Sequence, residues 1–178
     1  MTEYYRGKYR VPSARAAWHG YDGGTYFVTI CVADRVHAFG EVVAGEMCPT
    51  PLGIVANDYW EAIPQHHPGV TLYEFVLMPD HVHGVLELAP ERQADGGGSP
   101  VDLRAVIRGY KAAVTSQARR MGIPFAWQTR FHDHVVRHQD ERLRIEQYIR
   151  NNPVRWQEGR EAEAWWLRLM GRRPPRSM

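Results

Sequence analysis

The chain has 178 residues and a mass of 20.5 kDa, which suits a single domain with one hydrophobic core. At 44% hydrophobic residues, a chain of this length needs no disulfide bonds to fold. Cys31 and Cys48 form no Cys-x-x-Cys pair, which argues against a secreted disulfide scaffold and a structural zinc site. Neither an apolar signal segment nor a run of about 18 apolar residues is present. We therefore expect a cytoplasmic protein that is neither secreted nor membrane-spanning.

Charge is divided unevenly along the chain. Residues 1–100 carry 6 Lys and Arg against 12 Asp and Glu, whereas residues 101–178 carry 16 against 8, so the halves have net charges of −6 and +8. Twenty of the 22 basic residues are arginine, which binds phosphate in a bidentate manner. This pattern favours a nucleic acid partner, although a solvated helix face would carry the same excess.

The first half of the chain predicts three strands, a hairpin and a helix. Residues 26–32 are β-branched and aromatic and predict a central strand, and residues 38–47 predict a peripheral hairpin with its turn near Ala44-Gly45-Glu46. Apolar residues recur at helical spacing over residues 52–63. Residues 70–78 and 81–88 flank Pro79-Asp80, which predicts an antiparallel hairpin.

The second half predicts two helices and one more strand. Residues 94–100 are rich in glycine and predict a flexible connector. Helical spacing of apolar residues over 103–114 predicts a second helix, and residues 130–137 predict a fourth strand. A third helix is predicted over residues 141–151, ended by Pro153, and the tail from residue 171 to 178 is predicted to be disordered.

The order of these elements predicts the fold class. Strand, helix, strand, strand, helix, strand is the order of the ferredoxin-like split βαβ folds. We therefore expect one α+β domain, with an antiparallel sheet, helices on one face and an added C-terminal helix.

His81 and His83 are the first candidate site residues. They occupy alternate positions of a predicted strand, so both imidazoles project from the same face and can share one metal ion. Two histidines leave room for a third protein ligand and for substrate oxygens, as metal-assisted phosphoryl chemistry requires. A pair of half-buried structural histidines would give the same pattern.

Tyr148 and Asn152 are four residues apart and share one face of the third predicted helix. Tyrosine is a known covalent nucleophile, and a phosphotyrosine intermediate with a sugar hydroxyl leaving group is reversible, which suits strand transfer better than hydrolysis. A core tyrosine followed by an ordinary helix end at Pro153 is the competing interpretation.

Four segments together resemble the single-tyrosine, His-hydrophobe-His transposases, in particular the REP-associated tyrosine transposases. The resemblance runs from about residue 21 to 156, with the motifs in the family's order. These motifs are residues 26–30, 75–84, 127–134 and 148–153. It divides the chain into a basic N-terminal arm (1–20), a transposase-like catalytic domain (21–156), and a C-terminal helix with a disordered tail (157–178).

The resemblance also implies roles for single residues. By position, it assigns the metal-binding pair to His81 and His83, the third metal ligand to Asn152 and the nucleophile to Tyr148. Asparagine beside two histidines is a neutral ligand set, so we expect dependence on added Mg²⁺ or Mn²⁺. Tyr110, in the second predicted helix, stays open as an alternative nucleophile.

The implied activity is metal-dependent nicking and strand transfer on single-stranded DNA at hairpin-forming repeats, through a 5′-phosphotyrosine intermediate. The family further implies DNA transposition and recombination in the bacterial cytoplasm, in association with the nucleoid, and leaves a homodimer open. We expect backbone contacts from basic side chains and base stacking by aromatic ones. The candidates are Arg108, Lys111, Arg130 and Arg137 for phosphates, and Trp127, Tyr9 or Trp18 for bases.

Two rival functions stay open at this point. A histidine-triad-like nucleotide hydrolase would need a third histidine two residues after His83, where the chain has Val85. A domesticated, non-catalytic binder of DNA or RNA hairpins could use the same fold without chemistry.

Overall fold

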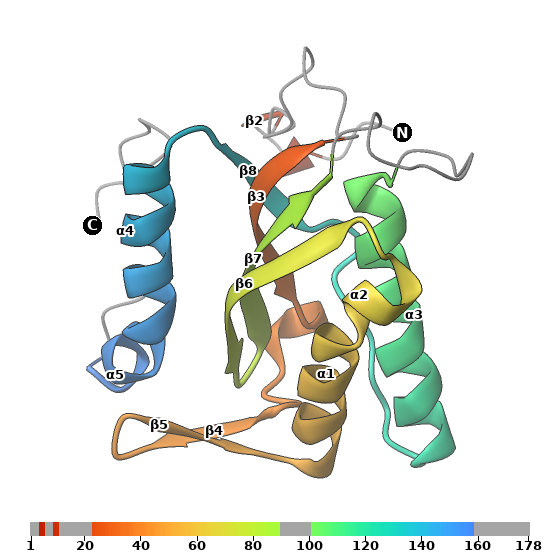
Figure 1. Cartoon of the computed structure of the whole chain (residues 1–178). Coiled ribbons are helices and arrows are strands. Elements are labelled where there is room, and N and C mark those ends of the chain that lie inside the picture. The colour runs from red at the N-terminus through yellow and green to blue at the C-terminus, as the bar shows by residue number, and fades with distance from the viewer. Residues whose placement is uncertain (1–3, 6–8, 11–22, 90–100, 159–178) are drawn as a thin grey trace.

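The computed structural model describes residues 4–5, 9–10, 23–89 and 101–158 (Figure 1). Within the predicted N-terminal arm, only the paired strands β1 (Tyr4–Tyr5) and β2 (Tyr9–Arg10) are described. The predicted connector at 94–100, the tail at 171–178 and Trp18 lie outside the described residues. None of the helices in the described ranges has the length and hydropathy required to cross a lipid bilayer.

One antiparallel sheet organises the described residues, and its spatial order is β6-β7-β3-β8 (Figure 1). The central strand β3 carries the β-branched and aromatic run seen in the sequence, and the central strand β7 is buried along nearly its whole length, as expected for strands with neighbours on both sides. This order is that of the ferredoxin-like fold, which confirms the predicted fold class. The strands are β3 (Gly24–Cys31), β6 (Val70–Met78), β7 (His81–Leu88) and β8 (His132–Val136).

The connections between these strands follow the predicted pattern. A 3₁₀ turn at Ala33–Arg35 and a separate hairpin, β4 (Gly40–Val43) and β5 (Glu46–Pro49), follow β3. The hairpin turns at Ala44 and Gly45, which both have positive φ, and this confirms the predicted turn. The helices are α1 (Pro51–Glu61), α2 (Ile63–His66), α3 (Leu103–Arg120), α4 (Gln139–Arg150) and α5 (Asn152–Gln157).

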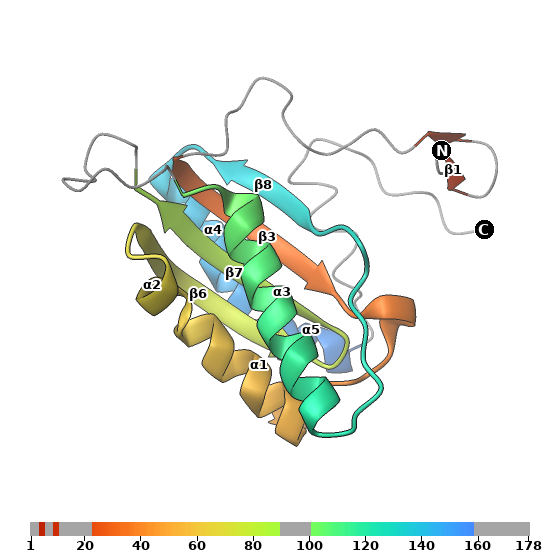
Figure 2. The same ribbon diagram turned by 90° about the vertical axis from the view of Figure 1, so that its right-hand side faces the viewer.

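Helices cover both faces of the sheet. Helices α1 and α3 pack on one face and α4 on the other (Figures 1 and 2). Alternate residues of β3 divide accordingly: Tyr26 packs in the core under α1 and α3, and Phe27 packs in the smaller core under α4. The helix on the second face is the third predicted helix, residues 141–151, so helices cover both faces where the sequence predicted one. The C-terminal helix predicted within residues 157–178 lies outside the described residues, apart from 157 and 158.

The sequence predicted that Pro153 ends the third helix, and the structure shows that it does not. Helix α4 ends at Arg150, Asn151 joins the two helices, and Pro153 lies in the first turn of α5. Proline is favoured in a first turn because its missing N–H would have no helical partner there. Asn152 is the first residue of the short helix α5, and its side chain is buried.

Gly84 on β7 allows a close approach between the sheet and Trp60 of α1. A Cβ atom at this position would lie 2.2 Å from Cζ2 and 2.6 Å from Cη2 of the Trp60 ring. Trp60 is buried and stacks on Phe75 at 4.8 Å between ring centroids, so the ring has little room to move.

We expect Gly84→Ala to lower the free energy of unfolding by roughly 1–3 kcal/mol, because the added methyl overpacks this contact. Urea denaturation followed by circular dichroism measures the change. Gly109→Ala is the matched control, since its new Cβ would meet no atom closer than 3.8 Å in the interior of α3. That control should be neutral or stabilising by up to about 1 kcal/mol. Equal stabilities of the two variants would contradict this packing.

Candidate active site

The two histidines of the sequence motif lie side by side in the interface between the sheet and α4. His81 and His83 are both buried on β7, on the face that also carries Val85. Their Nε2 atoms are 3.1 Å apart, and their ring centroids are 4.5 Å apart at an interplanar angle of 74°. The alternation of the strand therefore brings two imidazole nitrogens to one point, as predicted.

Each histidine is fixed by a polar neighbour at its other ring nitrogen. Nδ1 of His81 is 2.5 Å from Oδ1 of the buried Asp80, and Nδ1 of His83 is 2.8 Å from Oγ1 of Thr29. A carboxylate only accepts hydrogen bonds, so the Nδ1 atom of neutral His81 carries the hydrogen, and its Nε2 lone pair accepts from Nε2–H of His83. This is the arrangement by which proteins orient metal-binding imidazoles.

Burial keeps both imidazoles in the neutral form that ligates metals. Burial lowers the pKa of His81, while the hydrogen bond to Asp80 and the charge of Asp80 act in the opposite direction. The pKa of His83 is lowered well below its ordinary value, first by burial and then by the nearby His81 and Arg35. Neither ring needs to lose a proton at neutral pH before it binds a cation.

The donor atoms fit one divalent cation. Two nitrogen ligands with bonds of about 2.1 Å and an angle of about 90–109° at the metal lie about 3.0–3.4 Å apart, and the Nε2 atoms are separated by 3.1 Å. Among the described residues, no group of three His, Cys, Asp or Glu side chains could hold a metal. A third protein ligand in this part of the chain must therefore be of another type, such as the amide oxygen of the buried Asn152.

Tyr148 reaches the same interface from α4. Its ring centroid is 5.6 Å from that of His83 and 6.4 Å from that of Phe27, with the Phe27 ring edge-on. The side chain is 3% exposed. Burial raises the pKa of the phenol to about 12, and a hydrogen bond with Asn152 and the charge of Arg155 act against this rise. The hydroxyl is therefore protonated at neutral pH, it shares a hydrogen bond with Asn152, and the ring that carries it lies beside His83.

Tyr110, the alternative nucleophile, lies on the opposite face of the sheet. Its hydroxyl donates a hydrogen bond to the carbonyl oxygen of Ala56 at 3.1 Å, and its ring contacts Trp60 edge-on at 5.4 Å. Burial raises the pKa of this phenol. The sheet separates it from His81 and His83, so Tyr110 is a core residue that links α3 to α1.

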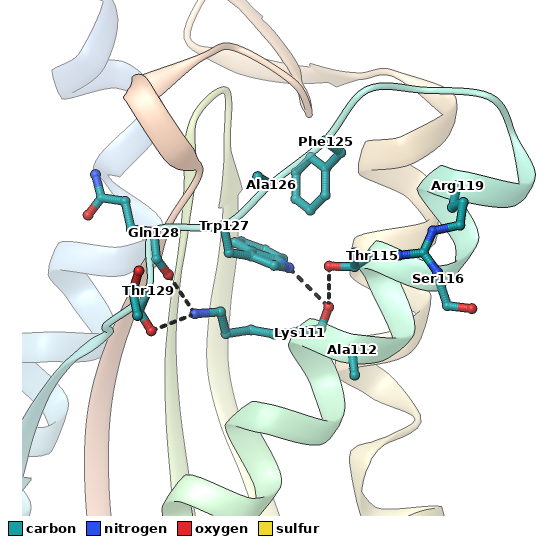
Figure 3. Close-up of a pocket in the computed structure, with 10 residues that line it drawn as sticks. All are labelled: Lys111, Ala112, Thr115, Ser116, Arg119, Phe125, Ala126, Trp127, Gln128 and Thr129. Atoms are coloured by element: carbon teal, nitrogen blue, oxygen red, sulfur yellow. Dashed lines mark hydrogen bonds between the residues drawn. The ribbon is translucent and has the colours of Figure 1, made fainter.

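Two of the predicted DNA-contact residues are engaged within the fold. Lys111 Nζ donates to the carbonyl oxygens of Gln128 at 2.6 Å and Thr129 at 3.3 Å, and Trp127 Nε1 donates to the Lys111 carbonyl oxygen at 3.1 Å (Figure 3). These bonds fasten residues 125–129 to α3 beside an open pocket of about 470 Å³, with Arg119 at its α3 side (Figure 3). The pocket lining does not include the histidine pair, which faces α4.

The remaining basic candidates are exposed. Arg108 lies on α3, and Arg130 and Arg137 lie on either side of β8. The backbone N–H of Arg137 donates to Glu141 at 2.9 Å, and Glu141 is also 2.8 Å from Nε2 of His134. His134 and Arg137 thus hold the first turn of α4 in place.

Sequence reasoning missed three residues that support the site. Asp80 was interpreted only as a turn residue, although it precedes the histidine pair directly. Thr29 shares a sheet face with Phe27 and pairs in register with His83. Strand alternation predicts the face of Thr29, but it does not predict which residue of the neighbouring strand lies opposite. Arg35, whose Nε is 3.0 Å from Oδ2 of Asp80, gave no signal in the sequence.

The raised pKa of Tyr148 predicts how stability depends on pH. Above pH 10 the unfolded chain loses a phenol proton that the folded chain keeps up to about pH 12, so the unfolded state is favoured as pH rises through this range. Between pH 9 and pH 11 the wild type should lose about 1 kcal/mol more free energy of unfolding than Tyr148→Phe. Urea denaturation at both pH values measures the difference, and equal losses would contradict the assignment.

An uncharacterized protein of Haemophilus influenzae (strain Rd) is 34% identical over 173 residues, which cover 88% of this chain and 96% of that protein. No family model matches the chain. Among solved structures, a REP-associated tyrosine transposase bound to a REP hairpin superposes with a TM-score of 0.57 at 21% identity, over 83% of this chain and 76% of that one. The two chains share a fold.

Proposed function

This chain belongs to one family with the uncharacterized Haemophilus influenzae protein, and from its transposase-like fold and its site we propose that it is a DNA-processing enzyme of the transposase kind. In this proposal it nicks single-stranded DNA at hairpin-forming repeats and transfers the strand through a 5′-phosphotyrosine. The observation that carries the proposal is the contact between the Tyr148 ring and His83, at 5.6 Å between centroids. A candidate nucleophile and a candidate metal ligand, 65 positions apart in the sequence, meet in one buried interface.

In the proposed reaction, the phenol oxygen of Tyr148 attacks a DNA phosphorus atom in line with the bond to the leaving O3′. The Tyr148 O–P bond forms, the P–O3′ bond breaks, and the phenol proton ends on the released 3′-hydroxyl. One phosphoester replaces another, so attack by a second 3′-hydroxyl rejoins DNA by the reverse step. A hydrogen bond with Asn152 and the charge of Arg155 both lower the pKa of the phenol and so favour the attacking phenolate.

A divalent cation, Mg²⁺ or Mn²⁺, would bind His81, His83 and Asn152 and would supply Lewis-acid polarisation of the scissile phosphate. The spacing of the two Nε2 atoms supports this ligand set. Asp80 and Thr29 would keep both rings oriented while substrate binds.

The DNA partner is proposed from charge and from the structural neighbour, which was solved with a REP hairpin. Exposed Arg108, Arg130 and Arg137 are candidates for phosphate contacts. A location in the bacterial cytoplasm at the nucleoid agrees with such a substrate, and homodimer formation stays a prediction of the resemblance.

One observation favours a second candidate function, a non-catalytic hairpin binder. The Tyr148 side chain is only 3% exposed and its phenol has a raised pKa, so DNA would have to displace part of α4 or α5 before cleavage. A histidine-triad hydrolase has no comparable support, because Val85 packs in the core where that family needs a third imidazole.

We expect Tyr148→Phe to reduce nicking of a hairpin-tailed single-stranded oligonucleotide by about 10³-fold or more while hairpin affinity changes little, because only the attacking oxygen is removed. A gel assay with Mg²⁺ or Mn²⁺ measures nicking, and fluorescence anisotropy measures binding. Tyr110→Phe is the matched control and should keep nicking. Full activity of Tyr148→Phe would exclude the proposed nucleophile, and a wild type that binds but never nicks would favour the non-catalytic binder.

We expect His81→Ala to weaken Mn²⁺ binding tenfold or more, because the cation loses one of its two nitrogen ligands. Isothermal titration calorimetry measures the affinity. His66→Ala, at an exposed position on α2, should bind Mn²⁺ like the wild type. Unchanged affinity in His81→Ala would place any metal elsewhere.

A further inference from the structure

Asp80 lies between a guanidinium and an imidazole. Its Oδ2 atom is 3.0 Å from Arg35 Nε, and its Oδ1 atom is 2.5 Å from His81 Nδ1. The Asp80 side chain is 4% exposed, whereas that of Arg35 is 49% exposed. A line of polar contacts therefore runs from the surface through Asp80 to the histidine pair.

Arg35 is held against Asp80 by a second contact and by an unusual backbone. Its Nη1 donates to Sγ of Cys31 at 3.1 Å, which fixes the plane of the guanidinium. Asp34 and Arg35 have φ values of 53° and 56°, in the left-handed region that side chains other than glycine rarely adopt. Such conformations persist where surrounding contacts impose them, and they cluster at functional sites.

Backbone hydrogen bonds impose this conformation. Val32 N–H donates to the Asp80 carbonyl oxygen at 2.8 Å, and Phe39 N–H donates to the Pro79 carbonyl oxygen at 3.1 Å. Ala33 N–H donates to Ala126 at 2.9 Å. The turn that carries Arg35 and the turn that carries Asp80 are thus joined on both sides of the positive-φ residues.

This arrangement determines which ring nitrogen of His81 carries the hydrogen. Because the carboxylate of Asp80 can only accept, it holds the hydrogen on Nδ1 and leaves the lone pair of Nε2 directed at His83, 3.1 Å away. The contact of Arg35 with Oδ2 of Asp80 leaves Oδ1 turned toward the ring. Only Arg35 is exposed to solvent, so its guanidinium both compensates the buried carboxylate and sets the direction in which that carboxylate faces His81.

We propose that Arg35 and Asp80 are a positioning pair that holds His81 in the Nδ1-protonated tautomer, with Nε2 presented to the site. The consequence for DNA cleavage rests on the proposed function, whereas the tautomer does not. Neither residue touches substrate in this role; both act through His81.

Nitrogen-15 NMR of the histidine side chains in the full-length protein tests the tautomer directly. We expect the wild type to show His81 with a protonated Nδ1 and an unprotonated Nε2. Asp80→Ala should shift His81 toward the Nε2-protonated form, and Asp80→Asn should largely retain the wild-type form because its amide oxygen can still accept. Mn²⁺ affinity, measured by calorimetry, should fall about 10- to 100-fold in Asp80→Ala and recover most of the way in Asp80→Asn.

Arg35 is the more exposed residue of the positioning pair, so we expect its substitution to leave the fold intact. Arg35→Ala should weaken Mn²⁺ binding severalfold, and Arg35→Lys should restore part of it. Glu141→Ala is the matched control: it removes the carboxylate 2.8 Å from His134 and should leave the His81 tautomer and Mn²⁺ affinity unchanged.

The outcomes separate this inference from the proposed function. If His81 stays Nδ1-protonated and Mn²⁺ affinity is unchanged in both Asp80→Ala and Arg35→Ala, the positioning pair is overturned. If the tautomer shifts in Asp80→Ala while the wild-type protein nicks no DNA, the positioning pair stands and the proposed reaction fails. If Asp80→Ala does not fold, unchanged Mn²⁺ affinity in Arg35→Ala alone overturns the role of Arg35.

Discussion

The packing of α4 against the sheet is the interaction on which the site depends. Ile145, Tyr148 and Ile149 of α4 form one small core with Phe27 and Val85. Polar contacts at the rim of that core set the position of the helix: Arg150 pairs with Glu74 at 2.8 Å, and the Arg142 guanidinium lies 4.3 Å from the centre of the Tyr73 ring. The same burial that secures the helix removes water from the histidines.

This burial has two opposite effects on chemistry. It keeps the imidazoles neutral and strengthens every electrostatic contact around them, which suits cation binding. It also raises the pKa of the Tyr148 phenol to about 12, so the hydroxyl is a poor nucleophile in the structure described. In the proposed reaction, DNA reaches this hydroxyl only when the interface opens, and exposure to water would lower the phenol pKa toward its ordinary value.

Local patterns predicted the elements, and the resemblance predicted which of them meet. Alternating and helical spacings identified the strands of the sheet and the helices on its first face. The position of α4 could not be predicted from spacing, because an amphipathic helix fits either face of a sheet. Lys111 and Trp127 were predicted to contact DNA from residue type alone, and those contacts stay predictions. The hydrogen bonds that both residues donate to carbonyl oxygens of the chain are not visible in the sequence. The role proposed for Asp80 follows from the direction of its carboxylate, which the sequence does not contain.

The β4-β5 hairpin lies outside the four-stranded sheet and yet supports the candidate site. A Cβ atom on Gly45, at the tip of the hairpin, would lie 3.2 Å from Cγ2 of Val154 on α5, the helix that begins with Asn152. Insertions between the first strand and first helix of a ferredoxin-like core are free to vary in length without disturbing the sheet. Changes in this hairpin can therefore adjust the placement of one candidate ligand while the two histidines stay fixed, a route by which related chains could diverge in metal preference with an unchanged core.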